Sequence, residues 1–240
     1  MKILEDVIAS LPQEKTKVRG IHVCAHWTAV LSRHCGLAST FKEEDHPHRG
    51  VRDVGDLAKK SAFELALYSR SEHLLEASIG MAALNSLIDI DESRCIEANA
   101  YEILLEKGKG KNVAIVGHFP FLSMLRESVK NLWVIEKRPL EGDLSEEAAG
   151  EILPQCDVVG ITGTTFINHT LEGLLAQCEE SFVALIGPTT PLSPVLFDYG
   201  IDVISGSKVM DPEEVILFIS QGATFKELHH HGVKLLTMMR

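Results

Sequence analysis

The chain has 240 residues, of which 45% are hydrophobic, and its formal net charge at pH 7 is −11. A chain of this length can bury a substantial core, whereas its negative charge excludes the basic footprint that nucleic-acid binding requires. No apolar run approaches the roughly 18 residues of a membrane span, so we expect no membrane contact.

The N-terminal stretch and the cysteines suggest a compartment. The first 14 residues place acids among apolar positions and lack a small-residue cleavage site, so they predict an amphipathic helix rather than a signal peptide. The five cysteines are scattered and form no CxxC pair, which favours free thiols in a reducing environment. We therefore expect a cytoplasmic protein.

Residues 1–108 predict a small α+β domain. A helix over about residues 3–11 precedes strand-like runs, which predict an antiparallel meander, and a polar loop. Helical patterns then resume, the second with a clear apolar stripe. The runs are 18–26, 28–33 and 36–41, the loop is 42–52, and the helices are 54–61 and 72–88.

His22, Cys24 and His26 alternate within the first strand-like run, which places them on one face and raises the question of a metal. Same-face neighbours in a strand lie about 7 Å apart, too far for three side chains to close easily on one ion. We expect no metal there.

The helix over 72–88 contains two unusual residues. Gly80 in a helix interior costs roughly 1 kcal/mol against alanine, so it predicts either a close backbone approach or a ligand contact. Glu76 shares its face one turn earlier. A solvated helix carboxylate is the ordinary interpretation of Glu76, and pattern alone favours it.

Residues 106–111 are polar and glycine-bearing, so we place a domain boundary between residues 108 and 109. Beyond it, short apolar strands alternate with helices. This alternation predicts a Rossmann-like α/β domain with a doubly wound parallel sheet and right-handed crossovers, and the tail 224–239 adds one or two edge strands. The strands are 113–117, 132–136, 158–162, 183–187 and 203–205; the helices are about 121–129, 144–151, 168–178, 192–198 and 211–221.

The turn after the first of these strands is Gly117-His118-Phe119-Pro120. Phe119 and Pro120 occupy positions where a pyrophosphate needs bare glycine backbone, so the turn is not a dinucleotide fingerprint. We expect the Gly117 and Thr162 turns to lie side by side at the carboxyl edge of the sheet, where α/β proteins bind ligands.

Other strand ends also carry polar groups. Glu136 follows Gly117 by 19 residues, near the spacing at which Rossmann domains place an acid on a ribose, although acids end many strands. Thr164 and Thr165 precede Asn168 and a helix, which predicts either an anion site or plain N-capping. The proline-rich loop that begins with Gly187, Pro188 and Thr189 predicts a rigid ligand-lining segment.

His229, His230 and His231 are consecutive, and in a strand they would point to opposite faces. We expect surface histidines. The sequence contains no HExxH, P-loop or GxSxG motif, so no strong metal, nucleotide or hydrolase signature exists.

Four segments together resemble the putative heavy-metal chelation family of anaerobic bacteria and archaea: 76–85, 116–120, 153–170 and 186–200. The resemblance implies a first domain with the fold of the enolase N-terminal domain, a Rossmann-like second domain, and one site between them. It also implies condensation or hydrolysis in pterin, flavin or siderophore-like chelator metabolism. Its matching positions are Glu76, Ser78, Gly80 and Asn85 in the first domain, and Gly117, His118, Pro120, Thr164, Thr165, Asn168, Gly187, Pro188 and Thr189 in the second.

Two interpretations remain open. One is an enzyme that binds a small polar ligand between the domains and uses Glu76 and His118 as acid and base, for which we expect the Glu76→Gln variant to fold but lose its ligand. The other is a non-catalytic module for a metal ion or a metal–chelator complex. The strand ends offer mostly hydroxyls, amides and glycines, which favours the organic ligand. The sequence identifies no cofactor and leaves homo-oligomerisation open.

Overall fold

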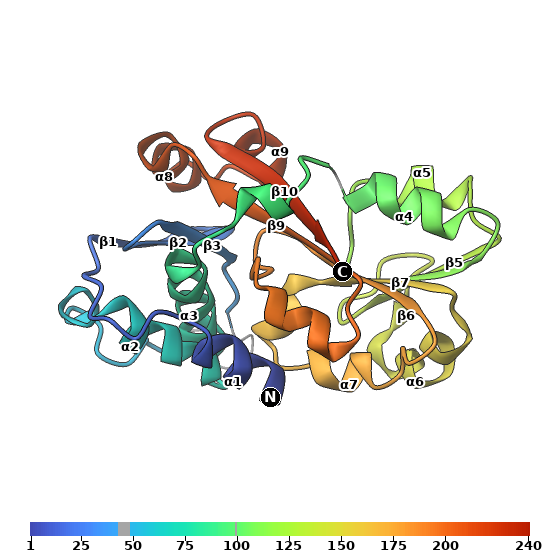
Figure 1. Cartoon of the computed structure of the whole chain (residues 1–240), viewed down its shortest axis with the longest axis horizontal. Helices are drawn as coiled ribbons and strands as arrows, with labels where there is room; N and C mark the ends of the chain where they lie inside the picture. The colour runs from blue at the N-terminus through green and yellow to red at the C-terminus, as the bar shows by residue number, and fades with distance from the viewer. Residues whose placement is uncertain (43–48, 99) are drawn as a thin grey trace.

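The computed structural model describes residues 1–42, 49–98 and 100–240, which form two sheets (Figure 1). After helix α1 (Lys2–Ala9), the small sheet consists of β1 (Gly20–Val23), β2 (Trp27–Leu31) and β3 (Cys35–Ser39). Its strands pair antiparallel in the order β1-β2-β3, as the predicted meander requires. Residues 43–48 of the predicted loop lie outside the described residues.

One face of the small sheet packs on α3 (Leu74–Leu87), most of whose residues are buried. The helix approaches its neighbours closely because glycine stands at the contacts. A Cβ on Gly80 would lie 1.9 Å from the backbone nitrogen of Ser69, and a Cβ on Gly36 would lie 2.1 Å from the carbonyl oxygen of Ala82. The close backbone approach expected at Gly80 is therefore made by η2 (Leu67–Arg70).

Ahead of α3, the helix predicted over 54–61 is wrong. A 3-10 turn, η1 (Leu57–Lys59), occupies part of that range, and α2 (Ala62–Ala66) begins only afterwards. Ser61 and Glu64 form a capping box, in which the Ser61 side chain accepts from the backbone of Glu64 and the Glu64 side chain accepts from the backbone of Ser61. This start signal fixes the helix after residue 61 rather than before it.

The large sheet has the strand order β10-β9-β8-β7-β4-β5-β6. All neighbours pair in parallel except β10, which pairs antiparallel with β9 as an edge strand. The doubly wound parallel sheet is therefore confirmed. The strands are β4 (Asn112–Val116), β5 (Asn131–Glu136), β6 (Leu144–Ser145), β7 (Val158–Thr162), β8 (Phe182–Ile186), β9 (Val203–Val209) and β10 (Val233–Met239).

Chain order along this sheet reverses between β4 and β7. The strands β4, β5 and β6 extend toward one edge, while β7, β8 and β9 extend toward the other. At such a switch point the connections leave in opposite directions and open a crevice outside the carboxyl ends of the strands. This crevice is where the topology places a ligand site.

Helices cover both faces of the large sheet (Figure 1). On one face, α4 (Ala100–Gly108) and α5 (Leu122–Arg126) pack over a cluster that includes Ile115, Val134 and Val158. The opposite face packs on the core that also contains α1 and α3. Five elements complete that layer and its connections: η4 (Glu146–Ala148), α6 (Ala149–Ile152), η5 (Leu153–Gln155), η6 (Gly163–Phe166) and α7 (Leu171–Leu175).

Some predicted helices are shorter or of another type. The range 144–151 begins with strand β6 rather than helix, and 192–198 forms a 3-10 helix, η7 (Pro194–Tyr199). In the range 168–178, α7 starts only at Leu171, because the Asn168 side chain accepts from the backbone nitrogen of Thr170 and ends the preceding turn.

The C-terminal segment returns to the small sheet. Helices α8 (Pro212–Ser220) and α9 (Phe225–Leu228) lie over the sheet face opposite α3 (Figure 1). Val215, Ile219 and Leu228 pack there on Trp27 and Leu37. The small sheet is thus covered by α3 on one face and by C-terminal helices on the other.

The expected boundary between residues 108 and 109 falls at the end of α4, which contacts β7 and β8. Because α4 packs with the large sheet, we propose that the division between the two regions lies before α4, next to η3 (Glu92–Arg94). Among the residues described, no helix has the length and apolar character needed to cross a membrane.

Candidate functional site

The turns after β4 and β7 lie side by side at the switch point, as predicted. Gly117 has φ +109°, and a Cβ there would lie 2.9 Å from Cβ of Thr162. Only glycine fits this turn, because both its backbone conformation and its neighbour exclude a side chain. His118 follows at once, with 47% of its side chain exposed.

A cavity of about 590 Å³, called here the aromatic cavity, opens beside these turns. Its lining comes from the small sheet, the start of α4, the loop after β4, the ends of β5, β7 and β8, and α9 with the residues after it. The rings of Phe119 and Phe121 are stacked with centroids 5.1 Å apart, and Tyr101 lies 5.5 Å from Phe121. These rings offer an apolar wall to a flat ligand.

A second cavity of about 550 Å³, called here the polar cavity, lies against α6 and α7. Its lining combines apolar residues with carboxylates, hydroxyls and amides, among them Glu146, Glu147, Asn168 and Gln177. Five residues line both cavities, so the two are adjoining parts of one cleft at the switch point. The shared residues are Phe41, Gly117, Glu136, Thr162 and Thr164.

Glu136 ends β5 at the junction of the two cavities. Its Oε2 accepts a hydrogen bond of 3.0 Å from the backbone nitrogen of Lys137. A carboxylate has several acceptor positions, so Glu136 keeps capacity for hydroxyl or amine groups of a ligand.

His118 contacts a carboxylate that the sequence analysis missed. Nδ1 of His118 lies 3.3 Å from Oδ2 of Asp143, whose side chain is only 5% exposed. Asp143 follows Gly142, which has φ +91°. The glycine marked a turn in the sequence, but nothing local indicated that the turn would face the loop after β4.

The loop after β7 satisfies much of its own polar capacity. The Thr165 hydroxyl donates to the carbonyl oxygen of Thr162 at 2.7 Å, and Thr162 is the N-cap of η6. Thr164 and Thr165 are not the N-cap of α7, which is Thr170, and the Asn168 side-chain oxygen accepts from Thr170. Thr164 and Thr165 nevertheless line the polar cavity, and Thr164 also lines the aromatic one.

The loop after β8 joins the two sheets. Thr189 is 1% exposed, and its hydroxyl accepts from the backbone nitrogen of Ser39 at 3.0 Å. The Asn85 amide donates to the carbonyl oxygens of Leu37 and Thr189. Gly187, Pro188 and Thr189 line the aromatic cavity. Asn85 does not line it but links β3 to the loop after β8 through these two hydrogen bonds.

Glu76 is buried, and the lining of neither cavity includes it. Its Oε1 accepts from the backbone nitrogen of Arg52 at 2.8 Å, its Oε2 accepts from the Ser71 hydroxyl at 2.7 Å, and the Arg52 guanidinium lies 3.3 Å away. Burial alone would raise the pKa of Glu76, but these donors and the Arg52 charge hold it below its ordinary value.

Ser78 and Pro120, the remaining predicted positions, differ in the same way. The Ser78 hydroxyl is fully buried, donates to Leu74 and accepts from Phe41. Pro120 lines the aromatic cavity. The structure therefore gathers the second-region positions around the cleft and leaves Glu76, Ser78 and Gly80 inside the first region.

The strand proposed to carry His22, Cys24 and His26 ends at Val23, so the three do not share a strand face. His229 and His230 follow α9, are exposed and line the aromatic cavity, whereas His231 contacts Glu214 and stacks on Phe218. None of the three lies in a strand, since β10 begins at Val233. The expected exposure is thus found for His229 and His230.

The sequence also did not predict that aromatic residues and a histidine from distant segments would line this cleft. Trp27, Tyr101, Phe225 and His230 converge only through the tertiary fold. The Trp27 ring nitrogen donates to the carbonyl oxygen of Ala223, which ties the small sheet to the segment before α9.

The chain is similar to several known proteins. Over 194 residues it is 31% identical to an uncharacterised protein of Methanocaldococcus jannaschii, a match that covers 77% of this chain and 73% of the relative. A crystal structure of a protein of unknown function from Desulfitobacterium hafniense matches with a TM-score of 0.88 and 27% identity, covering 100% of this chain and 98% of the other.

A second crystal structure, from Pyrococcus horikoshii, has a TM-score of 0.81 at 19% identity over 100% of this chain and 98% of the other, and shares the fold. Two family models, both described as putative heavy-metal chelation, match residues 4–88 and 99–238. The chain therefore belongs to the putative heavy-metal chelation family.

Proposed function

We propose that this protein is an enzyme that binds a small organic molecule with a flat ring and a hydroxylated part across the two cavities. The observation that carries the proposal is the aromatic cluster beside Glu136 at the switch point, in which Phe119 stacks on Phe121 and Tyr101 lies tilted against Phe121. A flat ring would stack in the aromatic cavity, and hydroxyl groups would reach the Glu136 carboxylate.

The chemistry of the polar cavity narrows the ligand. Glu136, Glu146 and Glu147 contribute three carboxylates, whereas Lys137 already pairs with Glu146 at 3.2 Å. A strongly anionic group would be repelled there, so the part of the ligand in this cavity is neutral or cationic. Hydroxyl groups and amines meet that requirement.

The reaction class we favour is condensation or hydrolysis on a pterin-like or flavin-like molecule, or on a siderophore-like chelator. Pterins and flavins are flat heterocycles with polar edges, which suits the two parts of the cleft. His118 is the group we assign to proton transfer. We assign to Glu76 the role of holding the segment at Arg52 against α3, because its oxygens are engaged there.

The alternative, a module that handles metal, is favoured by the family description and by the imidazoles of His118, His229 and His230 along the aromatic cavity. A bare ion does not fit: within the described ranges no three or more His, Cys, Asp or Glu residues are grouped to hold one. Burial also raises the pKa of Cys35 and Cys178 to about 12 and that of Cys156 to about 11, which favours the protonated thiol over the thiolate that binds metal. The metal-handling alternative is therefore restricted to a module that binds a metal–chelator complex.

Tryptophan fluorescence tests the proposal. The chain has two tryptophans, and Trp27 lines the aromatic cavity, whereas Trp133 contributes to neither lining among the residues described. We expect saturable quenching by at least one of a pterin, a flavin and adenosine, and loss of that quenching in Trp27→Phe. Zinc or cadmium ions alone should leave the signal unchanged.

Native mass spectrometry of freshly purified protein complements the titration. An organic adduct without metal supports the enzyme, and an adduct with the isotope pattern of a metal–chelator complex supports the alternative. Stoichiometric binding of a bare ion together with no response to any of the three ring compounds would refute the proposal.

A further inference from the structure

The carboxylate of Asp143 is held in place by its own turn. The backbone nitrogen of Leu140 donates to Asp143 Oδ2 at 3.0 Å, and the backbone nitrogen of Asp143 donates to the carbonyl oxygen of Leu140 at 3.0 Å. The next residue, Leu144, pairs with Ile135 and fixes the turn to β5. A buried acid is therefore presented by rigid backbone rather than by a loose side chain.

This acid meets one particular nitrogen of His118. The 3.3 Å contact joins Asp143 Oδ2 to Nδ1, and among described residues no hydrogen bond to Nε2 is formed. An ionised carboxylate attracts an N–H and repels a nitrogen lone pair, so this contact favours the proton on Nδ1. In a neutral imidazole the lone pair then lies on Nε2.

We infer that Asp143 is a positioning residue that fixes His118 in the tautomer with Nδ1 protonated, so that Nε2 accepts a proton from a ligand in the aromatic cavity. His118 lines that cavity with about half of its side chain exposed. The proton acceptor would serve a ligand hydroxyl, an amine or a water molecule, and the same nitrogen would return the proton later. The inference deepens the proposed function and rests on it for the identity of the proton donor.

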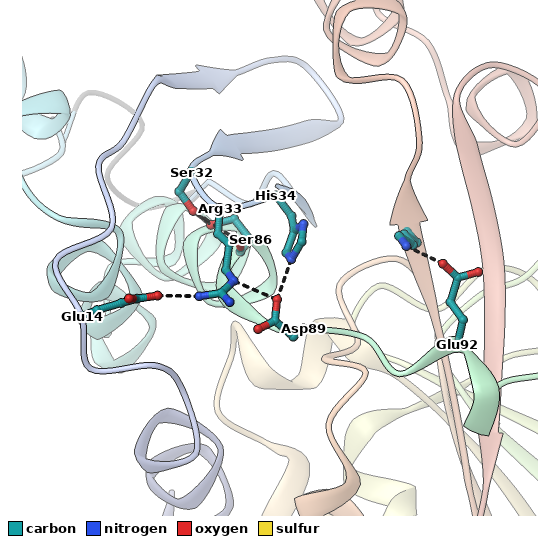
Figure 2. Close-up of polar contacts among 8 residues, drawn as sticks. Glu14, Ser32, Arg33, His34, Ser86, Asp89 and Glu92 are labelled. Atoms are coloured by element: carbon teal, nitrogen blue, oxygen red, sulfur yellow. Dashed lines mark hydrogen bonds and ion pairs between the residues drawn. The ribbon is translucent and has the colours of Figure 1, made fainter.

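A second histidine–aspartate pair serves as a control, because its histidine contacts the carboxylate through the other ring nitrogen. In Figure 2, His34 points to Asp89 at the end of α3, and here Oδ1 of the acid lies 2.9 Å from Nε2. The same oxygen accepts from Nε of Arg33 at 2.8 Å (Figure 2). Both side chains of this pair are about half exposed, and neither lines the aromatic or the polar cavity. Asp89 should therefore fix His34 in the other tautomer, with Nε2 protonated.

Long-range proton–nitrogen correlation NMR on uniformly labelled, ligand-free protein distinguishes the two tautomers. At a pH where the rings are neutral, the expected spectrum shows His118 protonated on Nδ1 and His34 protonated on Nε2. Signals are assigned with His118→Gln and His34→Gln. A wild-type His118 that is protonated on Nε2 overturns the inference without the need for any further variant.

The variant Asp143→Asn sharpens the result, because an amide that donates to Nδ1 moves the ring proton to Nε2. We expect the His118 pattern to change and the His34 pattern to stay, and the reverse for Asp89→Asn. An unchanged His118 pattern in a folded Asp143→Asn variant would also overturn the inference. The NMR experiment uses ligand-free protein, so its result does not depend on ligand binding. If the tautomer is as inferred but none of the ring compounds binds, only the proposed function is refuted.

Discussion

Helix α3 and the loops at the carboxyl edge of the large sheet both carry polar residues that the family resemblance singles out, yet they use them differently. On α3, Glu76 and Ser78 are buried and bonded to protein groups. At the edge, His118 and Thr164 line cavities. The difference teaches that a family motif inside a buried helix can build the scaffold while motifs at strand ends face the ligand.

The physical reason lies in solvation. In a helix buried on nearly all sides, a polar side chain without a partner costs about 1–3 kcal/mol, which favours pairing with protein groups. Glu76 and Ser78 therefore bind neighbouring backbone and side chains. A strand end at a switch point borders a cavity, where water or ligand can satisfy the group.

The largest expected effect is a loss of stability when the packing of α3 is disturbed. Gly80→Ala places a Cβ 1.9 Å from the backbone nitrogen of Ser69, so backbone must move, and we expect a loss of about 3 kcal/mol or more in the free energy of unfolding. Gly173→Ala is the matched control, since Gly173 lies in helix α7 with open space around it and should gain up to about 1 kcal/mol. Urea titrations of both variants measure this, and equal stabilities would contradict the packing role of Gly80.

The next effect concerns Glu76→Gln, which we expect to lower stability at pH 7 by about 2 kcal/mol because a charge-assisted set of hydrogen bonds is weakened. The folded-state pKa of Glu76 lies below its unfolded value, so this contribution is fully present above about pH 4.3. It disappears as the pH falls through the lower folded-state pKa.

Wild type and Glu76→Gln should therefore converge in stability in acid, and unfolding curves recorded from pH 7 downward would test this. Glu72→Gln serves as the control, because Glu72 is exposed shortly before α3 and its loss should change little. A stability difference that grows as the pH falls would contradict the stated pKa direction.

A smaller effect is expected where the two sheets meet. Thr189→Val removes the acceptor for the backbone nitrogen of Ser39 and should cost about 1–2 kcal/mol. The neighbouring hydroxyl of Thr190 is buried without a hydrogen-bond partner among the residues described, so Thr190→Val should cost less. Thermal or chemical denaturation of the two variants measures this difference. A larger loss of stability in Thr190→Val than in Thr189→Val would contradict the role of Thr189 in connecting the two sheets.

Much of the fold follows from local sequence. The runs that became β4, β7 and β8 are short, apolar and bounded by turns, so their positions were predictable to within about a residue. Strand β6 was not, because two residues carry no periodicity. The packing of α8 on the small sheet depends on tertiary contacts that no local pattern encodes.

The candidate site divides in the same way. His118 and Glu136 were identifiable because they follow strands of a predicted parallel sheet. Asp143 lies in a later loop and Tyr101 at the start of α4, and both reach the cleft only when the chain is folded. The family resemblance made Glu76 a site residue, and Gly80 on the same helix face indicated a close approach, but the approaching backbone is that of Ser69.

The central claim is that ligand chemistry belongs to the strand-end loops and not to α3. Titration of Glu136→Gln and Glu76→Gln with the ring compound that quenches Trp27 best tests it most directly. We predict that Glu136→Gln weakens binding about tenfold or more, as loss of a hydrogen bond to a charged group implies, while Glu76→Gln stays within about threefold of wild type. Unchanged binding in Glu136→Gln together with abolished binding in a folded Glu76→Gln variant would contradict the claim.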